Sequence, residues 1–129
     1  MRLGRDPMTW TITLPMIPES MNSRERSSFW ARKKELEQIT NAMEVLAIEA
    51  GIPSASGRRA VKVTIHKGKR SRVTDDPANR DSRAKSVLDA MVSLGLLVDD
   101  SDKWLDWEHV HEGERRDEKT TIIELRDVA

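Results

Sequence analysis

The stretch that decides the fold runs from Asp75 to Asp102 and reads DDPANRDSRAKSVLDAMVSLGLLVDDSD. Apolar residues recur in it every three or four positions, which predicts a helix from about Arg80 or Asp81 to Leu94. Gly95 follows as a natural helix terminator, and the apolar LLV segment then leaves the helix. The predicted buried stripe of this helix consists of Ala84, Val87, Leu88, Met91 and Leu94.

Strands and a second helix are predicted around this stretch. Residues 9–14 and 61–66 alternate between apolar and polar side chains, which is typical of strands. A helix is expected from about Ser27 to Ala50, where Gly51 and Pro53 stop it, after a loop over residues 15–25. Two further strands are expected at 104–110 and 120–125. The order β-α-β-α-β-β predicts an α/β (α+β) fold, a small mixed sheet with helices packed on it.

The composition fits one domain of a soluble protein. The chain has 129 residues, no cysteine and zero formal net charge, so disulfides, thiolate nucleophiles and cysteine zinc sites are excluded. No apolar run approaches the ~20 residues of a membrane span, and we expect a cytoplasmic protein without a membrane partner. We interpret residues 1–8 as an N-terminal extension and 9–129 as a single domain.

Charge is unevenly distributed along the chain. The segment 58–72 carries seven basic residues and no acid, whereas eleven acids face five bases from Asp99 onward. A basic strip beside an acidic cluster suits a polyanion held near metal ions. Lysines that guard a solvated edge strand explain the strip equally well.

The acidic ends of the predicted helix allow two interpretations. Asp81, Lys85 and Asp89 are spaced four residues apart and share one helix face. Capping of the helix start and a surface ion pair explain Asp81 and Lys85 singly. If the LLV segment folds back beneath the helix, however, Asp100 approaches Asp81. Such a cluster of acids is costly unless it binds a cation, and oxygen ligands favour Mg²⁺ or Mn²⁺.

The same stretch resembles the RusA-type Holliday-junction resolvases, which bacteria and phages use to cut branched DNA. Their pattern is D-x-D-N-x-x-K, a helix containing an aspartate, a glycine and a paired D-D. The corresponding runs here are NRDSRAK, SVLDAMVSLG and LLVDD, at the same spacing. The run TWTITLPMIPESMNSR is similar to the opening strand, proline-containing loop and asparagine of the family. The likeness covers about Thr9 to Leu125.

The resemblance implies catalytic roles for Asp81, Lys85 and Asp100. Asp81 and Asp100 would be carboxylate ligands of Mg²⁺, with Mn²⁺ as a substitute, and Lys85 would act near the scissile phosphate. It further implies a homodimer in a bacterial or phage-infected cell, because two symmetric cuts through a four-way junction need two sites.

Two motif positions depart from the family. Its first aspartate falls on Asn79, whose carbonyl oxygen still suits a hard cation, and its asparagine falls on Ser82. We expect Asp76 to restore the missing charge. The predicted metal ligands are therefore Asp76, Asn79, Asp81 and Asp100.

Basic residues are predicted to bind the DNA backbone, where contacts carry little sequence information. They are Lys62, Lys67, Lys69, Arg70, Arg72, Arg80 and Arg83. The leading hypothesis is a metal-dependent endonuclease that resolves Holliday junctions in DNA recombination and repair. The alternatives are a RusA-like protein that binds branched DNA without cutting it, because Asn79 removes one charge, and a non-catalytic dimeric regulator.

Overall fold

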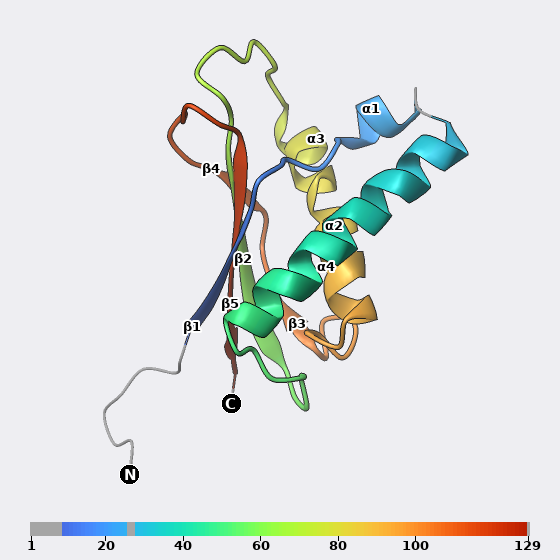
Figure 1. The fold of residues 1–129 in the computed structure, drawn as a ribbon, viewed down its shortest axis with the longest axis vertical. Coiled ribbons are helices and arrows are strands. Elements are labelled where there is room, and N and C mark those ends of the chain that lie inside the picture. The colour runs from blue at the N-terminus through green and yellow to red at the C-terminus, as the bar shows by residue number, and fades with distance from the viewer. Residues whose placement is uncertain (1–8, 26–27, 129) are drawn as a thin grey trace.

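The computed structural model of the protein describes residues 9–25 and 28–128 (Figure 1). The predicted extension over residues 1–8 lies outside the described residues. Helices and strands follow one another as β1 (Thr9–Leu14), α1 (Met21–Glu25), α2 (Phe29–Glu49), β2 (Arg59–His66), α3 (Pro77–Ser82), α4 (Ala84–Ser93), β3 (Leu105–Asp106), β4 (Val110–Glu112) and β5 (Thr120–Asp127).

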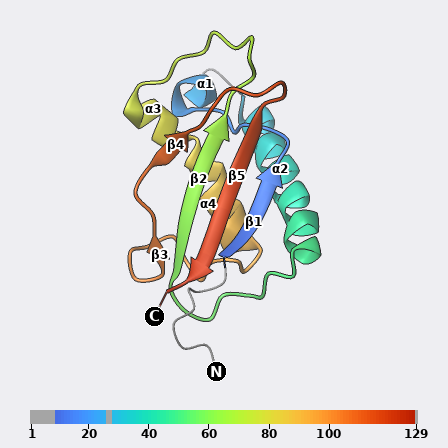
Figure 2. The ribbon, with the colours of Figure 1, turned by 90° about the vertical axis from the view of Figure 1, so that its left-hand side faces the viewer.

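The strands form one open, mixed sheet in the order β1-β5-β2-β3, and β4 also pairs with β2 (Figure 2). β5 lies antiparallel between β1 and β2, with Ile123 opposite Ile12 on one side and Val63 on the other. β3 and β4 run parallel to β2. Because parallel neighbours need a long crossover, the chain passes through α3 and α4 between β2 and β3.

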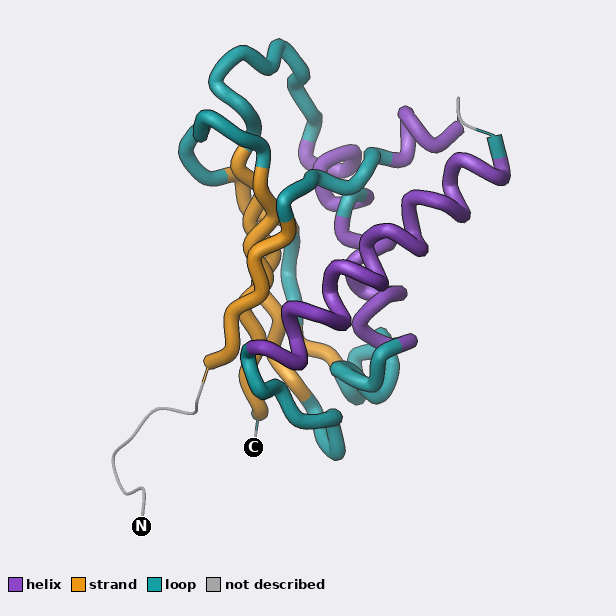
Figure 3. Tube along the Cα trace, viewed as in Figure 1, coloured by secondary structure: helices purple, strands orange, loops and turns teal. Residues whose placement is uncertain are grey.

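The core lies between one face of the sheet and the helices α2 and α4 (Figure 3). Every second residue of β1, β2 and β5 points into it, as the alternating patterns predicted. Within the described residues, the other face of the sheet is covered by no helix (Figure 2), and most of its side chains are polar. The largest buried apolar side chains include Ile12, Leu14, Ile39, Met43, Ile65, Met91, Leu97, Ile123 and Leu125.

The predicted mixed sheet with helices packed on it is confirmed, and several boundaries differ. The segment 15–25 was expected to be a loop, but it contains α1. The helix expected to begin at Arg80 or Asp81 begins at Pro77, because Asp76 caps it by accepting a hydrogen bond from the Asn79 amide. The single helix that was predicted is divided into α3 and α4. They are separated at Arg83, whose amide donates to the Arg80 carbonyl three residues back.

The strand predicted over 104–110 was also wrong in extent. The chain pairs with β2 only at β3 and again at β4, and the segment between them, which includes Trp107, is irregular. In α2, Ile39, Met43 and Ala47 are buried, whereas Ala50 is the exposed C-cap.

The chain reverses after α4 at Gly95, whose φ is +74°. The amides of Leu96 and Leu97 donate to the Met91 carbonyl, and both leucine side chains are buried. Leu96 and Leu97 therefore return against the core, whereas Val98 is exposed, so the fold-back that the sequence allowed occurs at the two leucines. This return sets the direction in which Asp99 and Asp100 leave the core.

A search of the described residues found no helix with both the length and the apolar character that crossing a lipid bilayer requires.

Replacing Gly95 by alanine is expected to lower the free energy of unfolding by about 1–2 kcal/mol, because a residue with a Cβ is strained at this φ. Gly57→Ala is the matched control, since its φ is not positive and the added Cβ meets no atom within 4 Å. That change is expected to alter stability by less than about 0.5 kcal/mol. Urea denaturation measures both. Equal losses in the two variants would contradict the assigned backbone constraint.

Candidate functional site

One hollow of about 200 Å³ brings together side chains from four parts of the chain. Asp81 comes from the end of α3, Lys85 and Asp89 from α4, Asp100 from the loop after Gly95, and Trp107 from the segment between β3 and β4. Leu88 supplies an apolar wall. The structure thus places Asp81, Lys85 and Asp100 around one space, which is named the acidic hollow below.

Asp81 is held in place by the sheet. Its Oδ1 accepts a hydrogen bond of 2.7 Å from the Val110 amide at the start of β4. A charged acceptor makes such a bond strong, and the carboxylate still has further lone pairs. This bond therefore orients the Asp81 carboxylate.

Lys85 and Asp89 form an i,i+4 pair, with Nζ 3.5 Å from Oδ2. The Lys85 side chain is 64% exposed, so this pair adds little to stability. The ammonium can therefore leave Asp89 for another anion at small cost. An exposed cation that lines the same hollow as Asp81 and Asp100 suits contact with a phosphate group.

The donor chemistry of the acidic hollow fits a hard divalent cation. Asp81 and Asp100 offer carboxylate oxygens, which Mg²⁺ and Mn²⁺ prefer. Within residues 9–25 and 28–128, no three acidic or histidine side chains are arranged as a ready metal cage. Mg²⁺ usually takes only one or two carboxylates and completes its shell with water and substrate phosphate. A cation held by Asp81 and Asp100 would therefore take its remaining ligands from water or from a phosphate group.

The structure places the other two predicted metal ligands elsewhere. Asp76 caps α3 through the 2.7 Å bond from the Asn79 amide. The Asn79 side chain donates to Asp75 and accepts from the Asn22 amide of α1. Neither side chain is among the described residues that line the acidic hollow. The geometry therefore gives no support to Asp76 as the replacement carboxylate.

A buried ionic cluster around Asp75 was not anticipated from the sequence. Its side chain is only 1% exposed and accepts two hydrogen bonds from the Arg83 guanidinium, at 2.8 and 3.0 Å. Lys67 Nζ lies 3.6 Å from the same carboxylate. The sequence signal for this cluster is the pair of adjacent acids, Asp75 and Asp76. Asp76 caps α3, and Asp75 is the buried member of the pair.

This cluster corrects two of the predicted DNA contacts. Arg83 is buried and also donates to the Pro18 carbonyl at 2.7 Å. Lys67 is buried too, between Asp75, Glu112 and the Val73 carbonyl. Both cations are engaged by these ion pairs and hydrogen bonds, and both also line a hollow of about 280 Å³.

The remaining predicted DNA contacts are accessible to different degrees. Arg70 and Arg72 are exposed on the loop after β2, and Lys69 is exposed there beside Asp117 at 2.9 Å. Arg80 is half-buried, and its Nε has no hydrogen-bond partner among the described residues. Lys62 lies on the polar face of the sheet, away from the core.

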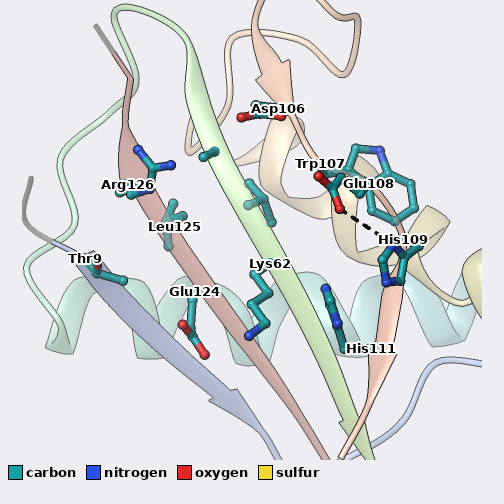
Figure 4. Close-up of a pocket in the computed structure, with 12 residues that line it drawn as sticks. Thr9, Lys62, Asp106, Trp107, Glu108, His109, His111, Glu124, Leu125 and Arg126 are labelled. Atoms are coloured by element: carbon teal, nitrogen blue, oxygen red, sulfur yellow. Dashed lines mark ion pairs between the residues drawn. The ribbon is translucent and has the colours of Figure 1, made fainter.

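Lys62 lines a second hollow, of about 300 Å³, on the polar face of the sheet (Figure 4). The rings of His109 and His111 lie there tilted by 41°, with their centroids 4.3 Å apart. Burial, and then the neighbouring His109, lower the pKa of His111, so its ring is neutral at pH 7. The lining contains both bases and acids, namely Lys62, Arg126, Asp106, Glu108 and Glu124. This mixture of charges gives the hollow no clear preference for a polyanion.

Asp75→Asn is expected to lower the free energy of unfolding at pH 7 by about 3 kcal/mol, because it leaves Arg83 and Lys67 buried without an anion. Arg83 holds the pKa of Asp75 below its ordinary value of 3.8. A carboxyl group whose pKa is lower in the folded than in the unfolded state stabilises the fold at every pH above its unfolded-state pKa. This contribution is lost progressively as the pH falls below about 3.8.

Urea denaturation of wild type and Asp75→Asn across this pH range checks the sign. The difference in unfolding free energy between the two proteins should be constant above about pH 5 and should become smaller below about pH 3.8. Asp102→Asn, at an exposed aspartate, is the control and should be close to neutral. A gap that persists unchanged into acid would show that the pKa of Asp75 is the same in the folded and unfolded states.

The chain matches no protein-family model and no curated protein sequence.

Proposed function

We propose that this protein is a metal-dependent endodeoxyribonuclease that cuts branched DNA, as a RusA-type Holliday-junction resolvase does. One observation carries the proposal. Asp81, Lys85 and Asp100 come from three parts of the chain and line one hollow, and they are the residues to which the resemblance assigns catalysis. The spacing in the sequence and the arrangement in space agree.

Each residue has a distinct task in this proposal. Asp81 and Asp100 would hold Mg²⁺, which, when bound, stabilises developing charge on the phosphate and lowers the pKa of water. The Val110 amide fixes the orientation of Asp81. Lys85 neutralises a phosphate oxygen, and Asp89 holds the ammonium nearby until substrate arrives.

The DNA backbone would lie against exposed cations. Arg70, Arg72 and Lys69 are available on the loop after β2, and Lys62 on the sheet. Phosphate contacts carry no sequence information, so the shape of the junction would dominate recognition. We propose a two-fold homodimer as the active species, because paired cuts require two acidic hollows.

One observation favours a second candidate, a protein that binds branched DNA without cutting it. The residue at the position of the family's first carboxylate is Asn79, and its amide bonds to Asp75 and α1. The acidic hollow then has fewer charges than the family pattern implies. A cleavage assay separates the two candidates, since both bind junctions and only one yields product.

With Mg²⁺, the purified protein is expected to nick a synthetic four-way junction at symmetric positions and to spare linear duplex. Asp81→Asn and Asp100→Asn should each slow cleavage more than about a hundredfold, because even residues that only orient metal ligands contribute ten- to a hundredfold. Asparagine keeps the acceptor that Val110 needs, so the fold and junction binding should persist. Gel assays of cleavage and binding measure both.

Asp76→Asn is the matched control for these variants. Asparagine caps a helix as well as aspartate does, and Asp76 is not among the lining residues, so cleavage should stay at the wild-type rate. Cleavage that persists in EDTA would contradict the metal mechanism. Loss of cleavage in Asp76→Asn would show that Asp76 contributes to the catalytic site.

Lys85→Gln is expected to abolish cleavage while it leaves the unfolding free energy within about 0.5 kcal/mol of wild type, because the exposed pair with Asp89 is weak. Mn²⁺ should still raise the melting temperature of this variant, but not that of Asp81→Asn. Thermal shift with and without Mn²⁺ measures this difference. A Lys85→Gln variant that cuts normally would remove the lysine from the mechanism.

A further inference from the structure

The first turn of α2 exposes two adjacent aromatic rings. Phe29 is 64% and Trp30 71% exposed, and the rings meet edge to face with centroids 5.4 Å apart. Aromatic side chains normally contribute their large apolar area to a core. Here α2 begins at its end farthest from the sheet (Figure 1), and both side chains are largely exposed.

Cations surround these rings. Arg32, Lys33 and Lys34 follow within one turn and are exposed, and residues 29–34 include no acid. Lys33 Nζ lies 5.5 Å from the centre of the Trp30 ring. Residues three and four apart share a helix face, so this spacing places positive charge beside both rings. We call Phe29, Trp30 and the three cations the aromatic-basic platform.

The other end of α2 provides a contrast within one helix. Val45 and Ile48 are also exposed there, at 55% and 73%. Acids flank them, at Glu44 and Glu49, instead of cations. Exposed apolar surface therefore occurs at both ends of α2, while the combination of rings with positive charge is found at the first end.

We propose that the aromatic-basic platform binds unpaired bases of a DNA strand. Bases stack on aromatic rings whatever their identity, and basic side chains follow the phosphates beside them. Paired bases in a duplex are already stacked on each other, so single-stranded segments are the form that offers free base faces. Branched DNA with a flap or a gap exposes such bases, and in this respect the inference rests on the proposed function.

The charge of the surface argues against a second copy of this chain as its occupant. A two-fold interface places a patch against the same patch of the partner. Three cations per copy would then face three cations, and like charges across an interface are unfavourable. A polyanion with flat apolar groups complements both features of the platform.

The platform is held in a set position relative to the acidic hollow. Glu35, one turn beyond Trp30, accepts from the Ser86 hydroxyl of α4 and from the Glu19 amide. Ser86 is the neighbour of Lys85. Met21 of α1, in turn, donates its amide to the Ser82 hydroxyl of α3 at 2.7 Å. A strand bound at the platform would therefore have a defined distance to Lys85.

Binding of a fluorescent oligo-dT strand in EDTA, followed by anisotropy, tests the platform without cleavage. Phe29→Ala/Trp30→Ala should weaken binding about tenfold or more, because each base stacked on an aromatic ring contributes substantially. Val45→Ala/Ile48→Ala removes similar exposed apolar area from the same helix and should bind within about twofold of wild type. Arg32→Gln/Lys33→Gln/Lys34→Gln should reduce the slope of log affinity against log salt by about two.

Two results would overturn the platform. One is unchanged oligo-dT affinity in Phe29→Ala/Trp30→Ala. The other is a change of oligomeric state by sedimentation in that variant with affinity per protomer unaltered, which would identify a contact between chains. Because the binding assay contains no metal, its outcome is independent of nuclease activity. If the protein cuts junctions but the platform variants bind oligo-dT normally, the proposed function stands and the platform is wrong. If the platform variants lose oligo-dT binding but the protein cuts no junction, the platform stands and the proposed function is wrong.

Discussion

The buried carboxylate of Asp75 is the interaction on which the site region depends. It accepts from Arg83 at the α3–α4 junction, lies near Lys67 after β2, and accepts from Asn79 in α3. Arg83 extends the network to the Pro18 carbonyl before α1. A carboxylate and two cations buried together are favourable only when their hydrogen bonds are satisfied, so these loops and α3 are fixed as one unit.

Features set by local physical rules were predictable from the sequence. Apolar periodicity located the stripe of α4, alternation located the strands, and Gly95 marked the reversal that directs Asp100 toward Asp81. The start of α3 was misplaced because Asp76 and Pro77 together begin a helix earlier than the apolar pattern does. The Asp75 cluster was not predictable, since Lys67 and Arg83 look like surface cations until tertiary burial pairs them.

The two proposed nucleic-acid surfaces have different physical origins. In the acidic hollow, negative groups converge through a chain reversal and one hydrogen bond from the sheet. In the aromatic-basic platform, the first six residues of α2 supply all five side chains. The first therefore depends on the tertiary fold, whereas the second depends on helix α2 remaining anchored through Glu35.

The sheet is covered on one face only, and this asymmetry divides the chain into positions with unequal evolutionary freedom. Each residue of β1, β2 and β5 that points to the helices is restricted in size and polarity by its neighbours. Its neighbours in sequence, such as Thr11 and Lys62, lie in water. Related chains can therefore diverge at alternate positions of these strands without refolding, so that similarity between them would survive as a period-two pattern of apolar residues.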